Sequence, residues 1–102
     1  MQVGLRTRLK PGAEERYEEY HRAVWPEVVE AIKRCGIRRY VIFRDGLDLF
    51  HFIECDDYDG AIAKIAKDPT SMRWEAEIAT MMAVTHDFSG QSSDRMRKIW
   101  EL

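Results

Sequence analysis

An Asp45-Gly46 dipeptide between two alternating runs is the feature that most constrains what this chain can fold into. The flanking runs, residues 38–44 and 47–55, alternate apolar and polar side chains with the two-residue period of β-strands. Aspartate and glycine both tolerate the positive φ that the two central positions of a tight hairpin favour. The dipeptide therefore predicts an antiparallel hairpin, and residues 3–9 alternate in the same way as a preceding strand.

Between the first strand and the hairpin, residues 13–35 change to the period of a helix. Side chains three and four apart form one stripe, made of Tyr17, Tyr20, His21, Val24, Trp25, Val28 and Ile32. Pro26 interrupts this helix, because it lacks an N–H and disfavours helical dihedrals at Trp25. We expect a kink or two helices meeting there. Further helices are expected at residues 60–67 and 72–83, and a last strand at 96–102.

The order β-α-β-β-α-β, with its second helix divided, is the ferredoxin-like split βαβ arrangement of the α+β class. Such a fold covers one face of an antiparallel sheet with helices, within a single domain of residues 1–102. Tyr40 and one row of the hairpin, either Phe50/Phe52 or His51/Ile53, are expected on the other face. Because that face is too apolar for water, two copies are expected to pair as a homodimer, a dimeric α+β barrel.

Charge and composition exclude several classes of partner. A net charge of −2 provides no basic face for nucleic acid. The longest apolar run, residues 40–43, is far too short to cross a membrane. Cys35 and Cys55 fit no metal spacing and are expected to be reduced thiols in a cytoplasmic protein.

The sequence has no local signature of a metal or nucleotide site, which leaves histidines, aromatics and carboxylates as candidates. His21 lies one helical turn after Tyr17 and one turn before Trp25. An imidazole with its ordinary pKa near 6.5 suits proton transfer if it faces a cavity. The alternative is a packed histidine bonded to a backbone carbonyl.

The other two histidines have less informative surroundings. His51, in a strand, is expected to serve packing or an interface rather than catalysis. His86 and Asp87 lie in the polar stretch 85–93, where they could close a site or only solvate a turn.

The pattern Tyr17-x-x-x-His21-x-x-x-Trp25-Pro26-Glu27 resembles the signature of the L-rhamnose mutarotase family. The likeness spans nearly the whole chain and continues collinearly through Gly36, residues 40–43, Arg73-Trp74 and Met82. It implies a dimeric α+β barrel without a cofactor that interconverts the α and β anomers of L-rhamnose. By position it implies that His21 is the catalytic acid and that Tyr17, Tyr40 and Trp74 contact the monosaccharide.

Two departures from the family pattern bear on the sugar. Members close to the type protein have two adjacent tryptophans, whereas here Glu75 follows Trp74. They also carry an Asn-Pro-Asp-Asn-Ser-Pro loop, of which Asp87 and Ser89 remain. Glu75 and Asp87 are expected to be sugar contacts, and L-fucose becomes an alternative substrate to L-rhamnose.

Mutarotation requires a proton for the ring oxygen and the loss of one from the anomeric hydroxyl. His21 would supply the first, and Glu75, Asp87 or a tyrosine hydroxyl could be the partner base. Two other functions fit the same barrel. One is a cofactor-independent monooxygenase or haem-degrading enzyme, and the other is a dimeric sugar-binding module without catalysis.

Overall fold

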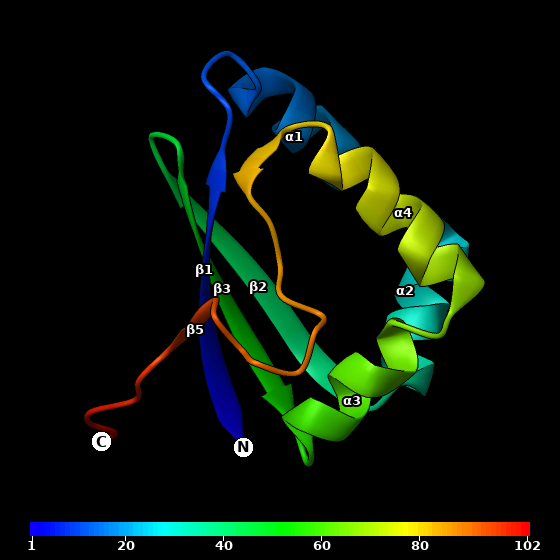
Figure 1. Ribbon diagram of the computed structural model, residues 1–102, viewed down its shortest axis with the longest axis vertical. Helices are drawn as coiled ribbons and strands as arrows, with labels where there is room; N and C mark the ends of the chain where they lie inside the picture. The colour runs from blue at the N-terminus through cyan, green and yellow to red at the C-terminus, as the bar shows by residue number, and fades with distance from the viewer.

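The computed structural model describes residues 1–102 and has the predicted ferredoxin-like architecture. Its sheet has the order β2-β3-β1-β4, with β5 pairing beside β4 on the same edge of β1, and every pair is antiparallel. Figure 1 shows the helices gathered on one side of this sheet. The elements are β1 (Gln2–Leu9), α1 (Glu14–Arg22), α2 (Pro26–Arg34), β2 (Ile37–Asp45), β3 (Asp48–Cys55), α3 (Tyr58–Ile65), α4 (Pro69–Ala79), β4 (Met82–Val84) and β5 (Arg95–Met96).

Pro26 divides the long helical segment as predicted. α1 ends at Arg22, and Pro26 occupies the first turn of α2, where a missing N–H costs no hydrogen bond. Trp25, the residue before the proline, has φ −55° and ψ 126°, outside the helical region. The break leaves His21 in the last turn of α1.

The hairpin forms at the predicted place, but its central residues lie one position later than expected. Asp45 pairs with Asp48, so Gly46 and Leu47 form the two-residue loop. Only Gly46 has positive φ, at 61°. Glycine at the first central position is typical of a type II′ turn, in which the second position accepts an ordinary residue.

The two faces of the sheet carry different rows. His51 and Ile53 lie on the face covered by helices, and Phe50 and Phe52 lie half-buried on the open face. Tyr40 pairs with Ile53 and therefore lies on the covered face, which corrects its expected place on the open one.

An irregularity in the register explains the position of Tyr40. Strict alternation from the buried Ile37 would place Tyr40 on the opposite face. The register shifts between Ile37 and Arg39, which brings Ile37 and Tyr40 to the same side.

Both later helices begin earlier than expected, because side chains cap them. The Asp57 carboxylate accepts from Gly60 N at 3.1 Å, and α3 begins at Tyr58 rather than at residue 60. The Asp68 carboxylate accepts from Ser71 N at 2.8 Å, so α4 begins at Pro69 rather than at residue 72. α4 ends at Ala79, because Met82–Val84 pairs with β1 as a strand.

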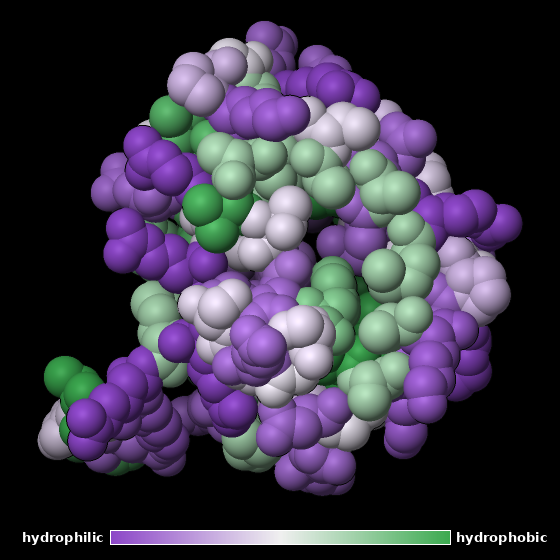
Figure 2. Space-filling view, viewed as in Figure 1, coloured by the Kyte–Doolittle hydropathy of each residue, from purple (hydrophilic) through white to green (hydrophobic).

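The expected C-terminal strand over residues 96–102 is reduced to Arg95–Met96. Met96 pairs with Gly4, so only Val3 and Gln2 of β1 remain beyond that pair. Residues 99–102 therefore run past the end of their only neighbouring strand. Figure 2 shows this tail standing clear of the body of the molecule, with Ile99, Trp100 and Leu102 exposed.

The core lies between the covered face of the sheet and the helices. Alternate residues of the central strands are fully buried, namely Val3, Leu5, Thr7 and Leu9 of β1 and Leu49, His51, Ile53 and Cys55 of β3. Cys35 and Cys55 are buried and unpaired, and they pack as small apolar side chains. None of the helices combines the length and hydropathy that a membrane crossing demands.

Candidate active site

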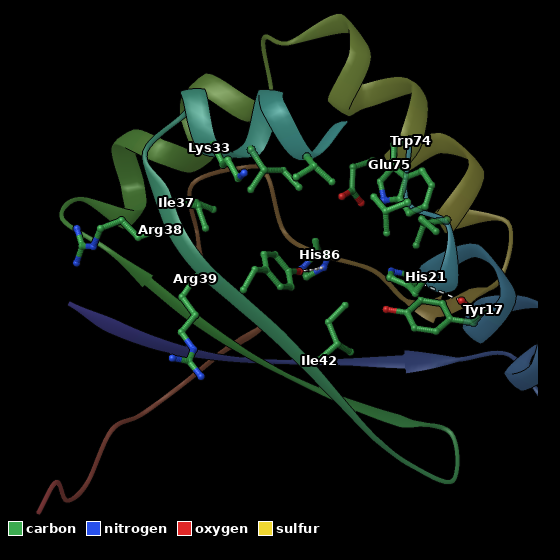
Figure 3. Close-up of a pocket in the computed structure, with 15 residues that line it drawn as sticks. Tyr17, His21, Lys33, Ile37, Arg38, Arg39, Ile42, Trp74, Glu75 and His86 are labelled. Atoms are coloured by element: carbon green, nitrogen blue, oxygen red, sulfur yellow. Dashed lines mark hydrogen bonds between the residues drawn. The ribbon is translucent and has the colours of Figure 1, made fainter. Parts of the chain in front are cut away.

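A cavity of about 520 Å³ opens between β2 and the helices α1, α2 and α4. Five of the six predicted site residues line it, together with His86 from the loop after β4. Those five are Tyr17, His21, Tyr40, Trp74 and Glu75. In Figure 3 the side chains of Tyr17, His21 and Glu75 converge on the space above Ile42. Residues from α1, β2, α4 and the loop after β4 thus meet at one place.

His21 is held by its own helix. Its Nδ1 lies 2.8 Å from the carbonyl oxygen of Tyr17, one turn earlier. Because a carbonyl only accepts, Nδ1 carries the hydrogen and Nε2 is left free. The Tyr17 and His21 rings also stack at 4.2 Å between centroids. The backbone bond considered for a packed histidine is therefore present, but the ring also faces the cavity.

Burial lowers the pKa of His21 below its ordinary value. The hydrogen bond to Tyr17 opposes this shift, and the charge of His86 adds to it. The neutral imidazole is therefore the main form at pH 7, and its cation is a stronger acid than free imidazolium.

Trp74 forms the apolar wall beside His21. It is buried, and its ring meets His21 edge-on at 5.6 Å and Trp25 edge-on at 5.1 Å between centroids. Tyr20 lies 5.9 Å away on a third side. Aromatic contacts on several sides fix the plane of Trp74, and a fixed flat surface can stack against the apolar face of a sugar ring.

Glu75 brings a carboxyl group into the same cavity. Burial raises its pKa, and the charge of His86 partly offsets that shift. Its charge in turn adds to the effect of burial in raising the pKa of Tyr17 and of Tyr40. A carboxyl group held this way can accept or donate a hydrogen bond to a sugar hydroxyl.

Tyr40 is joined to two histidines. Its hydroxyl lies 3.0 Å from His51 Nδ1 and 3.0 Å from His86 Nε2. On the far sides, His51 Nε2 lies 2.8 Å from Thr7 Oγ1, and His86 Nδ1 lies 3.4 Å from Asp94 Oδ2. A continuous polar chain thus runs from β1 across the sheet to the loop before β5.

Asp87, the sixth predicted residue, lies outside the cavity lining. Its carboxylate accepts from Ser89 N at 2.8 Å and from Ser93 N at 2.7 Å. The Ser89 hydroxyl also donates to this carboxylate. Together these bonds hold the pKa of Asp87 well below its usual range, and the bond from the Ser89 hydroxyl has the largest effect. The structure therefore gives Asp87 a role in the shape of the loop that carries His86.

Sequence reasoning left His86 only as a residue that could close a site or solvate a turn, and it gave no site role to Asp94 or His51. His86 and Asp94 lie eight residues apart in an irregular loop, where no period relates one side chain to the other. The buried state of Asp94, a carboxylate only 6% exposed, depends on its bonds to His86 and to Asp87 N. Only the unusual density of polar residues in that loop hinted at a site.

Comparisons with known proteins identify the family of the chain. A family model described as L-rhamnose mutarotase matches residues 2–102. An L-rhamnose mutarotase of Burkholderia orbicola is 36% identical over 87 residues, covering 83% of each chain. One of Opitutus terrae is 33% identical over 96 residues, covering 92% of this chain and 90% of that protein.

Solved structures share the fold. The L-rhamnose mutarotase of Formosa agariphila superposes with a TM-score of 0.79 at 24% identity, covering 100% of this chain and 98% of that one. Tetracenomycin F2 cyclase of Streptomyces glaucescens gives 0.74 at 16% identity, covering 100% and 96%. A putative antibiotic biosynthesis monooxygenase of Nitrosomonas europaea gives 0.59 at 20%, covering 81% and 87%. At such identities these likenesses show the architecture alone.

The family match and the curated relatives, unlike the fold, favour mutarotation over the monooxygenase alternative. The chain belongs to the L-rhamnose mutarotase family, isomerases that act at the anomeric carbon of the sugar.

Proposed function

We propose that the chain interconverts the α and β anomers of L-rhamnose in the cavity beside His21. The observation that carries this proposal is the fixed imidazole of His21, whose Nδ1 is bonded to the Tyr17 carbonyl and whose ring lines the cavity. Its free Nε2 is the one atom of the ring that can exchange a proton with a bound sugar.

The reaction follows from what Nε2 can do. The protonated Nε2 gives its proton to the ring oxygen while the anomeric hydroxyl loses one, and the C1–O5 bond opens to the aldehyde. Rotation about C1–C2 exposes the other face of the carbonyl, and the reverse transfers close the ring. A positioned acid or base contributes about 10²–10⁴-fold to such a step.

The sugar contacts come from the remaining lining residues. Trp74 provides a flat apolar surface for the ring and the methyl group of a 6-deoxy sugar. Tyr17, Tyr40 and Glu75 provide hydroxyl and carboxyl groups for its hydroxyls. Asp87 contributes indirectly, because its hydrogen bonds hold the loop that carries His86.

Glu75 makes L-fucose a second candidate substrate. A carboxyl group stands where close relatives of the type protein have an aromatic ring, and L-rhamnose and L-fucose differ in the orientation of ring hydroxyls. A half-buried carboxyl can discriminate such orientations, because a hydroxyl out of reach leaves it unpaired.

We also propose a homodimer formed through the open face of the sheet. Val41 lies opposite Phe52, and Phe43 lies opposite Phe50, so four apolar side chains adjoin on this face. Phe43 is 63% exposed in the single chain. A second copy would remove this patch from water. The unpaired thiols of Cys35 and Cys55 support the cytoplasm as the compartment.

Saturation-transfer NMR of the anomeric protons tests the function directly. Irradiation of one anomer of L-rhamnose should attenuate the signal of the other in the presence of the protein, in proportion to its concentration. Parallel samples of L-fucose rank the two sugars. Anomer exchange no faster than in buffer, for both sugars, would refute the proposed activity.

A further inference from the structure

The hydrogen-bond chain through Tyr40 has a single direction when the histidines are neutral. Asp94 is a carboxylate and only accepts, so His86 Nδ1 carries the hydrogen directed at it. His86 Nε2 then accepts, and the hydroxyl of Tyr40 donates to it. The oxygen of Tyr40 in turn accepts from His51 Nδ1, and His51 Nε2 accepts from Thr7. Every donor in this chain has one acceptor.

This direction leaves the Tyr40 oxygen as an acceptor toward the cavity. Its hydrogen points at His86, and of its two lone pairs only one is used by His51. Tyr40 and His86 both line the cavity that holds His21, and Figure 3 shows His86 on the far side of that space from His21. A sugar hydroxyl between them can donate to Tyr40.

We propose that Tyr40, His86 and Asp94 form the second acid–base group of the reaction, which the mutarotase function proposed above requires. The anomeric O–H bond breaks, and its proton passes to the Tyr40 oxygen while the proton of Tyr40 passes to His86 Nε2. The electron pair of that O–H bond forms the C1=O bond as C1–O5 breaks. The ring oxygen takes the proton from His21 Nε2, and closure of the ring reverses each transfer.

Three features of the site suit this relay. Burial raises the pKa of Tyr40 well above its ordinary value, so a transfer in which Tyr40 loses and gains a proton together avoids a phenolate. Asp94 faces the imidazolium that forms on His86, and its Oδ1 has no hydrogen-bond partner. The backbone fixes Asp94, since Arg6 N donates to its carbonyl at 2.8 Å.

His51 cannot serve in place of His86. It is 2% exposed and is absent from the cavity lining, and its pKa is lowered to about 3, first by burial and then by the charge of His86. Its ring lies 4.5 Å from that of His86, so the two cannot both be cations at low cost. The transferred proton therefore remains on His86, and His51 acts as a positioning residue for the Tyr40 oxygen.

His86→Gln is the decisive variant, because the amide oxygen still accepts from Tyr40 but cannot take up a proton. We expect kcat for L-rhamnose to fall about a hundredfold or more with KM within about threefold. Tyr40→Phe should have a similar effect on kcat. The double variant should be no slower than the slower single variant, because the two residues act as one unit. Phe88→Leu, beside the His86 ring at 6.0 Å, is the matched control and should stay within about threefold.

The pH profile separates a chemical from a structural role. The groups facing His86 are Tyr40 from β2, His51 from β3, Glu75 from α4, His21 from α1 and Asp94 before β5. With one proton shared between His21 and His86, kcat of the wild type should be bell-shaped in pH, and His86→Gln should lose one limb.

Outcomes for this relay are distinguishable from failure of the proposed activity. If the wild type does not accelerate anomer exchange, the mutarotase function fails. If the wild type is active and depends on His21, but His86→Gln retains kcat within threefold, the relay alone is overturned. Losses that multiply in the double variant, or a hundredfold loss in Glu75→Gln with His86→Gln unaffected, would also overturn it.

Discussion

The Nδ1–H of His21 donates to the carbonyl oxygen of Tyr17 across 2.8 Å, within the last full turn of α1. A single bond thus sets both the tautomer of the imidazole and the direction of its free nitrogen. The Tyr17 ring packs against His21 in the same turn. Rotation of either side chain would break this contact. This local arrangement leaves Nε2 as the nitrogen available for the proposed proton transfer.

His21→Ala should abolish most of the catalysis without unfolding the protein. The side chain is half-buried and bonds only to its own helix, so its loss leaves no distant partner unsatisfied. We expect kcat for L-rhamnose to fall about 10²–10⁴-fold, measured by saturation transfer. Arg22→Ala, the exposed neighbour, is the control and should be unchanged, with circular dichroism confirming that both variants fold.

Stability should decline as the pH falls, because of His51. Its pKa is about 3 when folded and 6.5 when unfolded, so the unfolded chain binds more protons between these values. Its contribution to the unfolding free energy is complete above pH 6.5 and is lost progressively below it, by about 2 kcal/mol between pH 7 and pH 5.

Urea denaturation at pH 7, 6 and 5 measures this slope. The matched variant is His51→Asn, which cannot titrate but keeps a donor for Tyr40. Its stability will be lower at pH 7, and its pH slope should be shallower than that of the wild type by about 2 kcal/mol over the same range. Equal slopes for the two proteins would contradict the assignment.

Trp74→Phe should weaken sugar binding more than it slows the chemistry. The smaller ring keeps an aromatic wall beside His21 but offers less surface for stacking. We expect KM to rise about tenfold, which corresponds to about 1.4 kcal/mol, with kcat within a fewfold. Initial rates at several sugar concentrations separate the two constants, and a kcat loss with constant KM would rule out a binding role for Trp74.

Glu75 should govern the choice between L-rhamnose and L-fucose. Glu75→Gln keeps the shape of the side chain but removes the charge, and Glu75→Trp puts an aromatic ring beside Trp74 in its place. We expect Glu75→Trp to shift the ratio of kcat/KM toward L-rhamnose by about tenfold, from the loss of one buried hydrogen bond. Competition between the two sugars in one NMR sample gives the ratio, and an unchanged ratio in both variants would remove Glu75 from specificity.

A charge on the open face should prevent the proposed homodimer from forming. Phe43→Lys places an ammonium among Val41, Phe50 and Phe52, where it would be buried without a partner in a face-to-face pair. Light scattering at micromolar concentration should show a dimer for the wild type and a monomer for Phe43→Lys. Ala63→Lys on the exposed side of α3 introduces the same charge away from this face and should remain dimeric.

Local chemistry made much of the fold predictable. A proline after several helical turns interrupts the helix, so the break at Pro26 could be expected from the sequence. Glycine after aspartate is typical of a hairpin turn, so the hairpin at Gly46 could be expected as well. The prediction of a C-terminal strand over residues 96–102 was wrong for a different reason. Its alternation is real, but a strand requires a partner, and β1 ends before residues 99–102.

The site was predictable where it lies on regular elements. Tyr17 and His21 share a face of α1, so their spacing brings them together, whereas Trp25 lies beyond the end of α1 and contacts Trp74. His86 and Asp94 meet only because an irregular loop returns to pair with β1, and no local pattern encodes that path. Asp87 shows that neighbours in sequence need not share a site. It directly follows His86, but its carboxylate bonds within its own loop and lies outside the cavity lining.

The register shift between Ile37 and Arg39 has a consequence for length variation in β2. Arg38 is the additional residue and has no pairing partner in β3, while Ile37 lies opposite Cys55 and Tyr40 lines the cavity. Deletion of Arg38 would leave Ile37 and Tyr40 two residues apart in a strictly alternating strand, which keeps both side chains on the covered face. The shortened strand would therefore keep its core residue and its cavity phenol, and it would lose the ion pair between Arg38 and Asp56.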